Sequence, residues 1–156
     1  MTEGEDFTYS KARCRVQRLL SIRERSEEEI RTRLDNQHYT QAVIDDTIKH
    51  FKGLGFLDER AFTRSWIVSR LNKPFGLERI HYELIEKGID RTIIQEELDK
   101  ALPSYDEDAI VLNLIRQQIK KYTHLKPDKR NQRLIAFLNR RGFSDEAINQ
   151  ALRKFS

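Results

Sequence analysis

The chain has 156 residues, of which 38% are apolar and 35% charged, and its formal net charge is +4. This composition supplies apolar side chains for several small cores, and the few prolines and glycines exclude a collagen-like or low-complexity chain. No apolar run is long enough for a membrane-spanning helix, the start lacks the apolar segment of a secretory signal, and the single cysteine excludes an internal disulfide. We therefore expect a cytoplasmic protein without membrane contact.

The first predicted unit covers residues 10–54 and follows an acidic leader at residues 1–9. Tyr9 and Ser10 predict the hydrophobic staple and the N-cap of the first helix in this unit. This helix has an apolar face, on which we expect Cys14 to be buried as a small hydrophobic side chain.

The second predicted unit covers residues 55–103, and Leu57 and Asp58 predict the staple and the N-cap of its first helix. The third covers residues 104–156, where the capping box Ser104–Glu107 predicts the start of the first helix. Each unit is therefore expected to open with a helix of its own.

One apolar frame recurs in all three units with identical internal spacing. Its copies are Ile30, Leu34, Tyr39, Val43, Ile44, Ile48 and Phe51; Ile80, Leu84, Ile89, Ile93, Ile94, Leu98 and Ala101; and Leu134, Leu138, Phe143, Ala147, Ile148, Leu152 and Phe155. The first two residues of each copy share one helical face, and the last four lie on the next helix. The capping box Ser26–Glu29 and the N-cap residues Thr40, Asp90 and Ser144 mark where these helices begin. The pattern predicts an all-α fold of three tandem three-helix repeats in an elongated, curved array.

The turn between the two helices of the frame contains Gly88 in the second copy and Gly142 in the third. Glycine tolerates the left-handed backbone that ends many helices, so both residues predict such a turn. His38 occupies this position in the first copy, and we expect a more strained or longer turn there.

Charge is distributed unevenly along the chain. The first ten residues carry −3, residues 11–33 carry +4, residues 34–110 carry −5, and residues 111–156 carry +8. Two basic regions on either side of an acidic middle suit a mixed surface, such as protein assembled on nucleic acid. The simpler alternative is that helical surfaces are rich in lysine and arginine in any case.

The densest motif is Gly55–Phe62, which reads Gly-Phe-Leu-Asp-Glu-Arg-Ala-Phe. The structural motif residues are Gly55, Leu57, Asp58, Phe62, Trp66, Gly76, Gly88 and Gly142. Together they resemble the RecX family of bacterial recombination regulators, and the similarity covers nearly the whole chain. Phe62 and Trp66 are four residues apart on one helix, and we expect them to pack in a core rather than stack on bases.

The resemblance implies a regulator that binds the RecA filament on single-stranded DNA. It further implies inhibition of RecA ATP hydrolysis, strand exchange and coprotease activity, with roles in homologous recombination, DNA repair and the SOS response. The implied partners are the RecA filament, single-stranded DNA and, more weakly, double-stranded DNA. We expect a monomer without a cofactor.

Basic side chains are the candidate contacts for RecA or DNA. They are Arg13, Arg15, Arg25, Arg64, Arg70, Lys73, Arg79, Lys120, Lys121, Lys126, Lys129, Arg130, Arg133, Arg140 and Arg141. Some of them are expected to be ordinary solvated surface, because arginine stems also cover apolar area. The stretch 122–133 is basic and contains Pro127, so it is the candidate contact loop.

Two other function classes stay open at this stage. Small three-helix units resemble helix-turn-helix readers, so the chain could be a direct DNA-binding module that acts without RecA. A helical scaffold without nucleic-acid contact would leave the basic third unit unexplained. The sequence shows no phosphate-binding glycine loop, no nucleophile paired with a base and no metal-ligand spacing among its histidines, so we expect no enzymatic activity.

Overall fold

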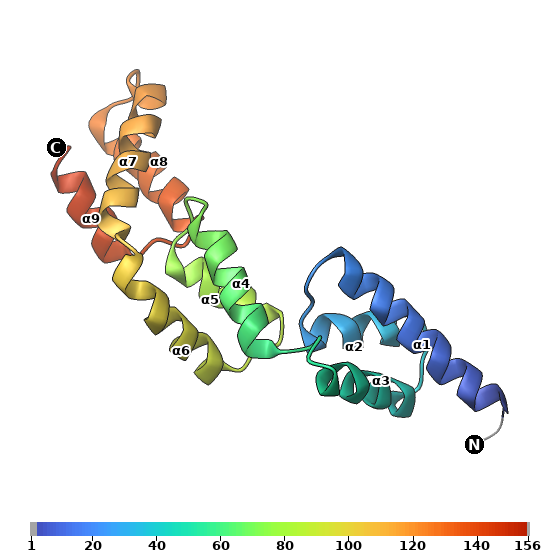
Figure 1. Cartoon of the computed structure of the whole chain (residues 1–156). Coiled ribbons are helices and arrows are strands. Elements are labelled where there is room, and N and C mark those ends of the chain that lie inside the picture. Colours follow the sequence, from blue (N-terminus) through green and yellow to red (C-terminus); the bar gives the residue numbers. More distant parts are fainter. Residues whose placement is uncertain (1–2, 156) are drawn as a thin grey trace.

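The computed structural model describes residues 3–155, and these residues form helices joined by short turns (Figure 1). Unit 1 contains α1 (Glu3–Ile22), α2 (Glu27–Asp35) and α3 (Gln41–Gly53); unit 2 contains α4 (Glu59–Leu71), α5 (Leu77–Glu86) and α6 (Arg91–Ala101); unit 3 contains α7 (Glu107–Ile119), α8 (Pro127–Asn139) and α9 (Asp145–Arg153). Short 3-10 turns follow α6 (η1, Leu102–Ser104) and α7 (η2, Lys120–Tyr122). The predicted all-α fold of three tandem three-helix repeats is confirmed.

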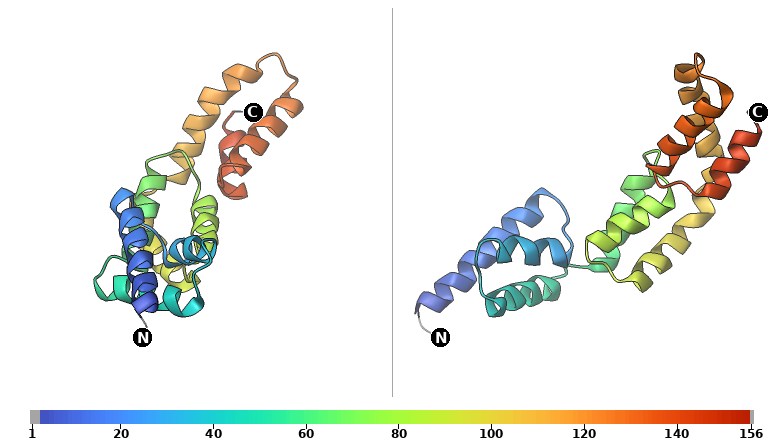
Figure 2. Two further views of the ribbon diagram at one scale, coloured as in Figure 1. Left: turned by 90° about the vertical axis from the view of Figure 1, so that its right-hand side faces the viewer. Right: turned by 180° about the vertical axis from the view of Figure 1, so that it is seen from behind.

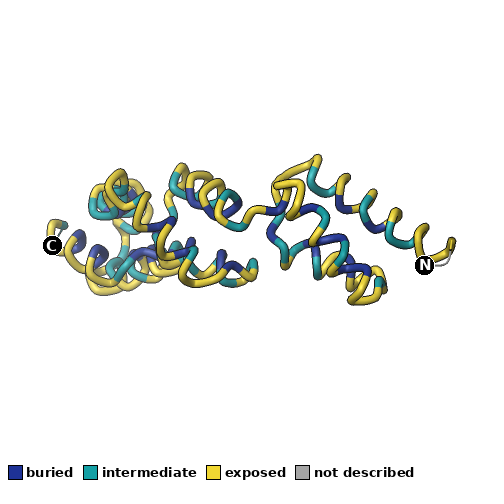
Figure 3. Tube along the Cα trace, turned by 60° about the horizontal axis from the view of Figure 1, so that its bottom comes forward, coloured by how far each residue is buried: buried dark blue, intermediate teal, exposed yellow. Residues whose placement is uncertain are grey.

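Each unit has its own hydrophobic core, and the recurring frame supplies most of it. The three clusters of buried residues are centred on Ile30, Leu34 and Ile44 in unit 1, Ile80, Leu84 and Ile94 in unit 2, and Leu134, Leu138 and Ile148 in unit 3. Buried stretches of the chain accordingly alternate with exposed ones along the whole array (Figure 3). Three small cores, rather than one large one, explain the elongated shape.

The predicted capping chemistry is largely confirmed. Ser26 and Glu29 form the reciprocal capping box at the start of α2. At the other predicted starts, side chains accept hydrogen bonds from backbone N–H groups two or three residues later; these caps are Thr40, Asp58, Asp90 and Ser144. Such caps contribute about 1 kcal/mol each.

Left-handed turns follow α2, α5 and α8. Gly88 and Gly142 have φ angles of 75° and 78°, as predicted, and His38 has a φ angle of 63°. The first copy therefore makes the same turn as the others, but with a side chain that this backbone disfavours.

The predicted start of the first helix is wrong. In the described residues α1 already begins at Glu3, so Ser10 lies inside the helix and does not cap it. Acidic side chains at Glu3, Glu5 and Asp6 favour a helix start there, because they complement its positive N-terminal end. The burial of Cys14 is also wrong: its side chain is exposed, while Ala12 and Val16 form the buried stripe.

Two further predictions about helix starts need correction. Asp106, and not Ser104, caps α7, while Ser104 lies in η1 and donates a hydrogen bond to the carbonyl of Ala101 at the end of α6. Glu107 instead accepts hydrogen bonds from the backbone and hydroxyl of Ser144 at the start of α9. Leu57 packs in the core of unit 1 rather than in unit 2, because the chain has not yet left unit 1 at this point.

The units follow one another in an extended array that bends between unit 1 and unit 2 (Figures 1 and 2). Within residues 3–155, no helix combines the length and the apolar character that crossing a membrane requires.

Both junctions between units use the same pair of elements: the left-handed turn of the later unit meets the start of the second helix of the earlier one. Between units 2 and 3, the N–H groups of Gly76 and Glu78 donate to the carbonyls of Arg141 and Gly142, at 2.8 and 3.2 Å. A Cβ atom on Gly76 would overlap the carbonyl of Gly142. Between units 1 and 2, Gly88 lies against Glu28, where an added Cβ would come within 2.7 Å of the Glu28 Cβ atom.

Candidate partner interface

Cations and aromatic rings form a contiguous ribbon across all three units. Its members are Arg23, Lys87, Trp66, Arg70, Phe75, Arg79, Arg141 and Phe137. We call this set the cation–aromatic ribbon. It begins beside the start of α2, crosses α4 and α5, and ends at α8 and the turn that follows it.

The unit 1 end of the ribbon is organised by the carboxylate of Glu29. Arg23 and Lys87 each donate to its Oε1 atom at 2.8 Å, and the Ser26 backbone N–H donates to its Oε2 atom at 3.0 Å. Burial alone would raise the pKa of Glu29, but these hydrogen bonds lower it to about 2. Glu29 therefore stays charged and fixes both cations in place.

Trp66 links this end to the middle of the ribbon. Lys87 and Arg70 lie over its ring, each 4.4 Å from the ring centre, and its indole N–H donates to Glu83 at 3.0 Å. Phe62, in contrast, is buried and stacks on the Trp66 ring. The predicted core role therefore holds for Phe62 and in part for Trp66, which is partly buried, packs against the same core and shares its ring with two cations.

Phe75 is the centre of the ribbon where units 2 and 3 meet. The guanidinium carbons of Arg79, Arg70 and Arg141 lie 4.0, 5.8 and 5.9 Å from the centre of its ring. Arg141 also lies 4.7 Å from the ring centre of Phe137 and donates to the carbonyl of Pro74 at 3.2 Å. Three arginines from α4, α5 and the turn after α8 are thus held around one ring.

Glu83 balances part of this positive charge. It accepts hydrogen bonds from Arg70 at 2.7 Å and from Arg79 at 3.0 Å. Burial would raise the pKa of Glu83, but the hydrogen bond from Arg79 and the charge of Arg70 lower it. The arginines are therefore oriented by a charged carboxylate, and their remaining N–H groups can face a partner.

A groove of about 430 Å³ adjoins the unit 1 end of the ribbon. Arg25 and Arg33 line it together with Arg23. Burial and the neighbouring positive charge of Arg23 lower the pKa of Arg25, and its Nε atom is buried without a hydrogen-bond partner. Glu28, Glu29 and Glu86 also line the groove, so it extends the ribbon with cations and carboxylates of nearly balanced charge.

The other cationic surface is the tip of unit 3, defined as residues 116–133. Its basic residues are Arg116, Lys120, Lys121, Lys126, Lys129, Arg130 and Arg133, and its acidic residue is Asp128. The end of α7, the turn η2 and the first turns of α8 bring these side chains together. All are exposed except Arg130, which is partly buried with its Nε atom unpaired.

The remaining predicted contacts lie apart from both surfaces or are only adjacent to them. Arg13 pairs with Asp46 inside unit 1, and Arg64 lies 3.4 Å from the buried carboxylate of Glu97 inside unit 2. Arg15 lines a pocket between α1 and the turn before α3, Lys73 is exposed in the turn after α4, and Arg140 is the exposed C-cap of α8. The structure thus brings Arg70, Arg79 and Arg141 together, places Arg25 beside them, and gathers the unit 3 lysines at the tip.

Sequence reasoning missed four members of the ribbon: Arg23, Lys87, Phe75 and Phe137. One signal could have found Lys87, because it precedes the left-handed glycine at the frame position that the predicted contact Arg141 occupies in the third copy. Nothing comparable marks Phe75, whose role depends on the approach of unit 3.

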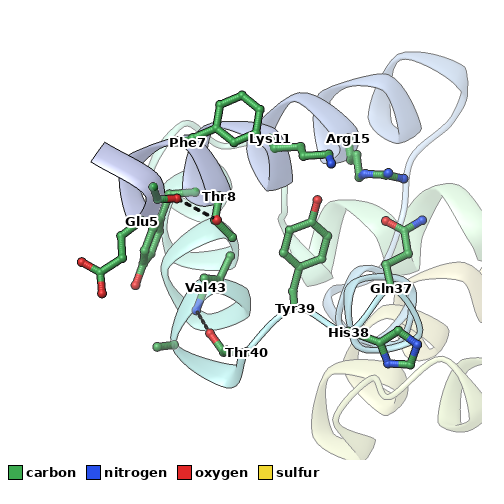
Figure 4. Close-up of a pocket in the computed structure, with 13 residues that line it drawn as sticks. Glu5, Phe7, Thr8, Lys11, Arg15, Gln37, His38, Tyr39, Thr40 and Val43 are labelled. Carbon is green, nitrogen blue, oxygen red and sulfur yellow. Dashed lines mark hydrogen bonds between the residues drawn. The ribbon is translucent and has the colours of Figure 1, made fainter. Parts of the chain in front are cut away.

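A pocket of about 640 Å³ lies between the start of α1 and the turn that precedes α3 (Figure 4). Tyr39 points toward α1, and His38 points away from it (Figure 4). In units 2 and 3 the corresponding turn packs against the preceding unit. The pocket therefore occupies the place at which the turns of units 2 and 3 contact the preceding unit.

Comparison with known proteins identifies relatives along the whole array. The family models for the first, second and third three-helix domains of RecX match residues 12–51, 58–98 and 106–152. The regulatory protein RecX of Chlorobium phaeobacteroides is 38% identical over 138 residues, which cover 86% of this chain and 87% of that protein. The regulatory protein RecX of Prosthecochloris aestuarii is 37% identical over 150 residues, which cover 94% and 95% of the two chains.

Solved structures show the same fold. The crystal structure of RecX from Lactobacillus salivarius superimposes with a TM-score of 0.79 at 19% identity, covering 96% of this chain and 97% of that one. A second crystal structure, of a regulatory protein RecX, gives a TM-score of 0.83 at 22% identity and covers 94% of this chain and 73% of that one.

Proposed function

The chain belongs to the RecX family of regulatory proteins, and on that premise we propose that it binds the RecA filament on single-stranded DNA and restrains RecA. The restraint covers RecA ATP hydrolysis, strand exchange and coprotease activity. The protein then acts as a cytoplasmic monomer in recombination, DNA repair and the SOS response. It regulates RecA by binding and catalyses no reaction itself.

The observation that carries this proposal is the continuity of the cation–aromatic ribbon across three units. A filament presents the same protein surface repeatedly along its axis, and an extended array can contact more than one copy of that surface. Arginines fixed over aromatic rings suit such a protein contact, because they are already ordered before binding and lose little side-chain entropy.

The second candidate function is direct DNA binding without RecA. The charge at the tip of unit 3 favours it, since clustered cations bind nucleic acid through phosphate contacts. The two functions predict different binding preferences between the RecA filament and bare DNA. A RecA regulator binds the filament more tightly than bare DNA, whereas a DNA-binding module shows no such preference.

RecA ATP hydrolysis on single-stranded DNA tests the proposal. Adding the protein at a low ratio to RecA should lower the rate of ATP hydrolysis, and an unchanged rate at saturating protein would rule the proposal out. Arg141→Gln should weaken this inhibition, because Arg141 belongs to the ribbon. Arg140→Gln is the matched control, since the neighbouring side chain is exposed and outside the ribbon. Equal inhibition by both variants would show that the ribbon does not make the contact.

A further inference from the structure

Among the described residues, ion pairs are confined to two of the three units. Among residues 3–155, every ion pair lies within unit 1, within unit 2 or between the two. The tip of unit 3 carries seven basic residues and one acidic residue, and none of its cations has a carboxylate partner in the described part of the chain. The positive charge of units 1 and 2 is thus largely balanced internally, whereas that of the tip is not.

Exposed apolar side chains show the opposite distribution. The large hydrophobic residues that are exposed are Phe7, Ile22, Leu54, Phe56, Val68, Tyr82 and Leu102. All of them precede unit 3, and no large apolar side chain is exposed in residues 103–155. Protein interfaces depend on apolar and aromatic anchors, whereas a phosphate backbone is held by charge alone. The tip therefore offers what a phosphate backbone requires and lacks what a protein surface requires.

We propose that the two surfaces have different partners: the tip of unit 3 contacts the phosphodiester backbone of nucleic acid, and the cation–aromatic ribbon contacts protein. This assignment rests on the proposed function, because it assigns the nucleic acid and the protein of the filament to different surfaces of the chain. Four of the seven basic residues at the tip are lysines, and a lysine is a mobile point charge that follows a phosphate chain without fixed geometry. The tip lies at the end of the array opposite unit 1 (Figure 1), so it can reach nucleic acid while the ribbon lies against protein.

The salt dependence of binding to a bare strand tests the assignment. The test variant carries Lys120→Gln, Lys121→Gln and Lys129→Gln. The matched control carries Lys11→Gln, Lys49→Gln and Arg91→Gln, which remove three exposed charges from units 1 and 2. Both variants have the same net charge, so a general charge effect is the same in each. Binding to fluorescein-labelled oligo(dT) is measured by anisotropy over a series of KCl concentrations, and circular dichroism verifies that both variants remain helical.

Each phosphate contact on a single strand contributes about 0.7 to the slope of log affinity against log salt, so the tip variant should lose about 2 from this slope. Over a fourfold increase in KCl, the wild type should then lose roughly 20-fold more affinity than the tip variant does. The control should keep the wild-type slope.

Four outcomes overturn the assignment. The first is the same salt-dependence slope in the wild type and the tip variant. The second is a decrease in this slope that is equal in the tip variant and the control variant. The third is a tip variant that binds oligo(dT) normally but no longer binds the RecA filament, because the tip would then contact protein.

RecA ATP hydrolysis is measured in parallel. A wild type that inhibits RecA without binding oligo(dT) also overturns the role of the tip, while the proposed function stands. A wild type that binds oligo(dT) through the tip but leaves RecA unaffected supports the nucleic-acid role of the tip, and only the proposed function fails.

Discussion

Lys87 at the end of α5 donates a hydrogen bond of 2.8 Å to the carboxylate of Glu29 in the first turn of α2, and this ion pair joins units 1 and 2. The corresponding contact between units 2 and 3 joins backbone groups, with the Gly76 N–H donating to the Arg141 carbonyl at 2.8 Å. A lysine side chain has several rotatable bonds, whereas a backbone pair holds two chains at a fixed distance. Unit 1 is therefore expected to move more freely than unit 3 relative to unit 2.

Removing the Lys87 charge should loosen the first junction only. Spin labels on Cys14, which is exposed, and at position 99 through Asp99→Cys report the distance between units 1 and 2. Lys87→Gln should broaden this distance distribution in electron–electron double resonance, because the remaining amide holds Glu29 less strongly.

A second label pair serves as the control for this measurement. With Cys14→Ser, labels introduced by Asp99→Cys and Asn113→Cys span units 2 and 3, and their distance distribution should be unchanged by Lys87→Gln. Broadening of both distributions would show that Lys87 supports the whole array rather than one junction.

The two glycines at the second junction should not tolerate alanine. Gly76→Ala places a methyl group onto the Gly142 carbonyl, and Gly142→Ala adds the strain of a φ angle of 78° to an overlap with Arg79. Each change should lower the free energy of unfolding by about 1–3 kcal/mol. Gly53→Ala is the control: nothing lies within 4 Å of the added Cβ, and the residue ends α3, so stability should be unchanged or higher by up to about 1 kcal/mol. Urea unfolding curves distinguish the variants.

His38→Gly should stabilise unit 1. The histidine has a φ angle of 63°, which costs about 1–2 kcal/mol for a residue with a Cβ atom. Glycine relieves this strain but gains entropy in the unfolded chain, so the expected net increase in stability is about 0.5–1 kcal/mol. His38→Ala keeps the Cβ atom and should give no increase. Thermal melts of the two variants compare the effects directly, and equal melting temperatures would contradict the strain argument.

Acid should weaken the cap and junction at Glu29. The pKa of Glu29 is about 2 in the folded protein, against an ordinary value of 4.5. Because the unfolded chain takes up this proton more readily, the charged group stabilises the fold above about pH 4.5, and that contribution disappears as the pH falls toward 2. Glu29→Gln should therefore lower the free energy of unfolding by roughly 2 kcal/mol at pH 7.

The difference between the wild type and Glu29→Gln should shrink steadily in urea titrations between pH 4.5 and 2. A difference that stays constant over this range would mean that Glu29 acts through shape rather than through charge.

Local chemistry explains which parts of the fold could be predicted. Ser26 and Glu29 are three residues apart, so their capping box depends on nothing beyond their own helix. The prediction for Ser104 failed because Ser104 belongs to the 3-10 turn η1, where its hydroxyl donates to the Ala101 carbonyl, and α7 begins only after Asp106. Cys14 was misplaced because the buried stripe of α1 is formed by Ala12 and Val16, and Cys14, two residues from each, lies on the opposite side of the helix.

By itself, the sequence determined the three-helix repeat, the separate cores and the left-handed turns at Gly88 and Gly142, because each of these depends on residues close together in the chain. Only the tertiary structure decided which cations meet. Arg79 and Arg141 are far apart in sequence and reach Phe75 together only after unit 3 has packed against unit 2. Contacts of this kind depend on how the units approach one another, and the spacing of residues within a unit carries no information about that geometry.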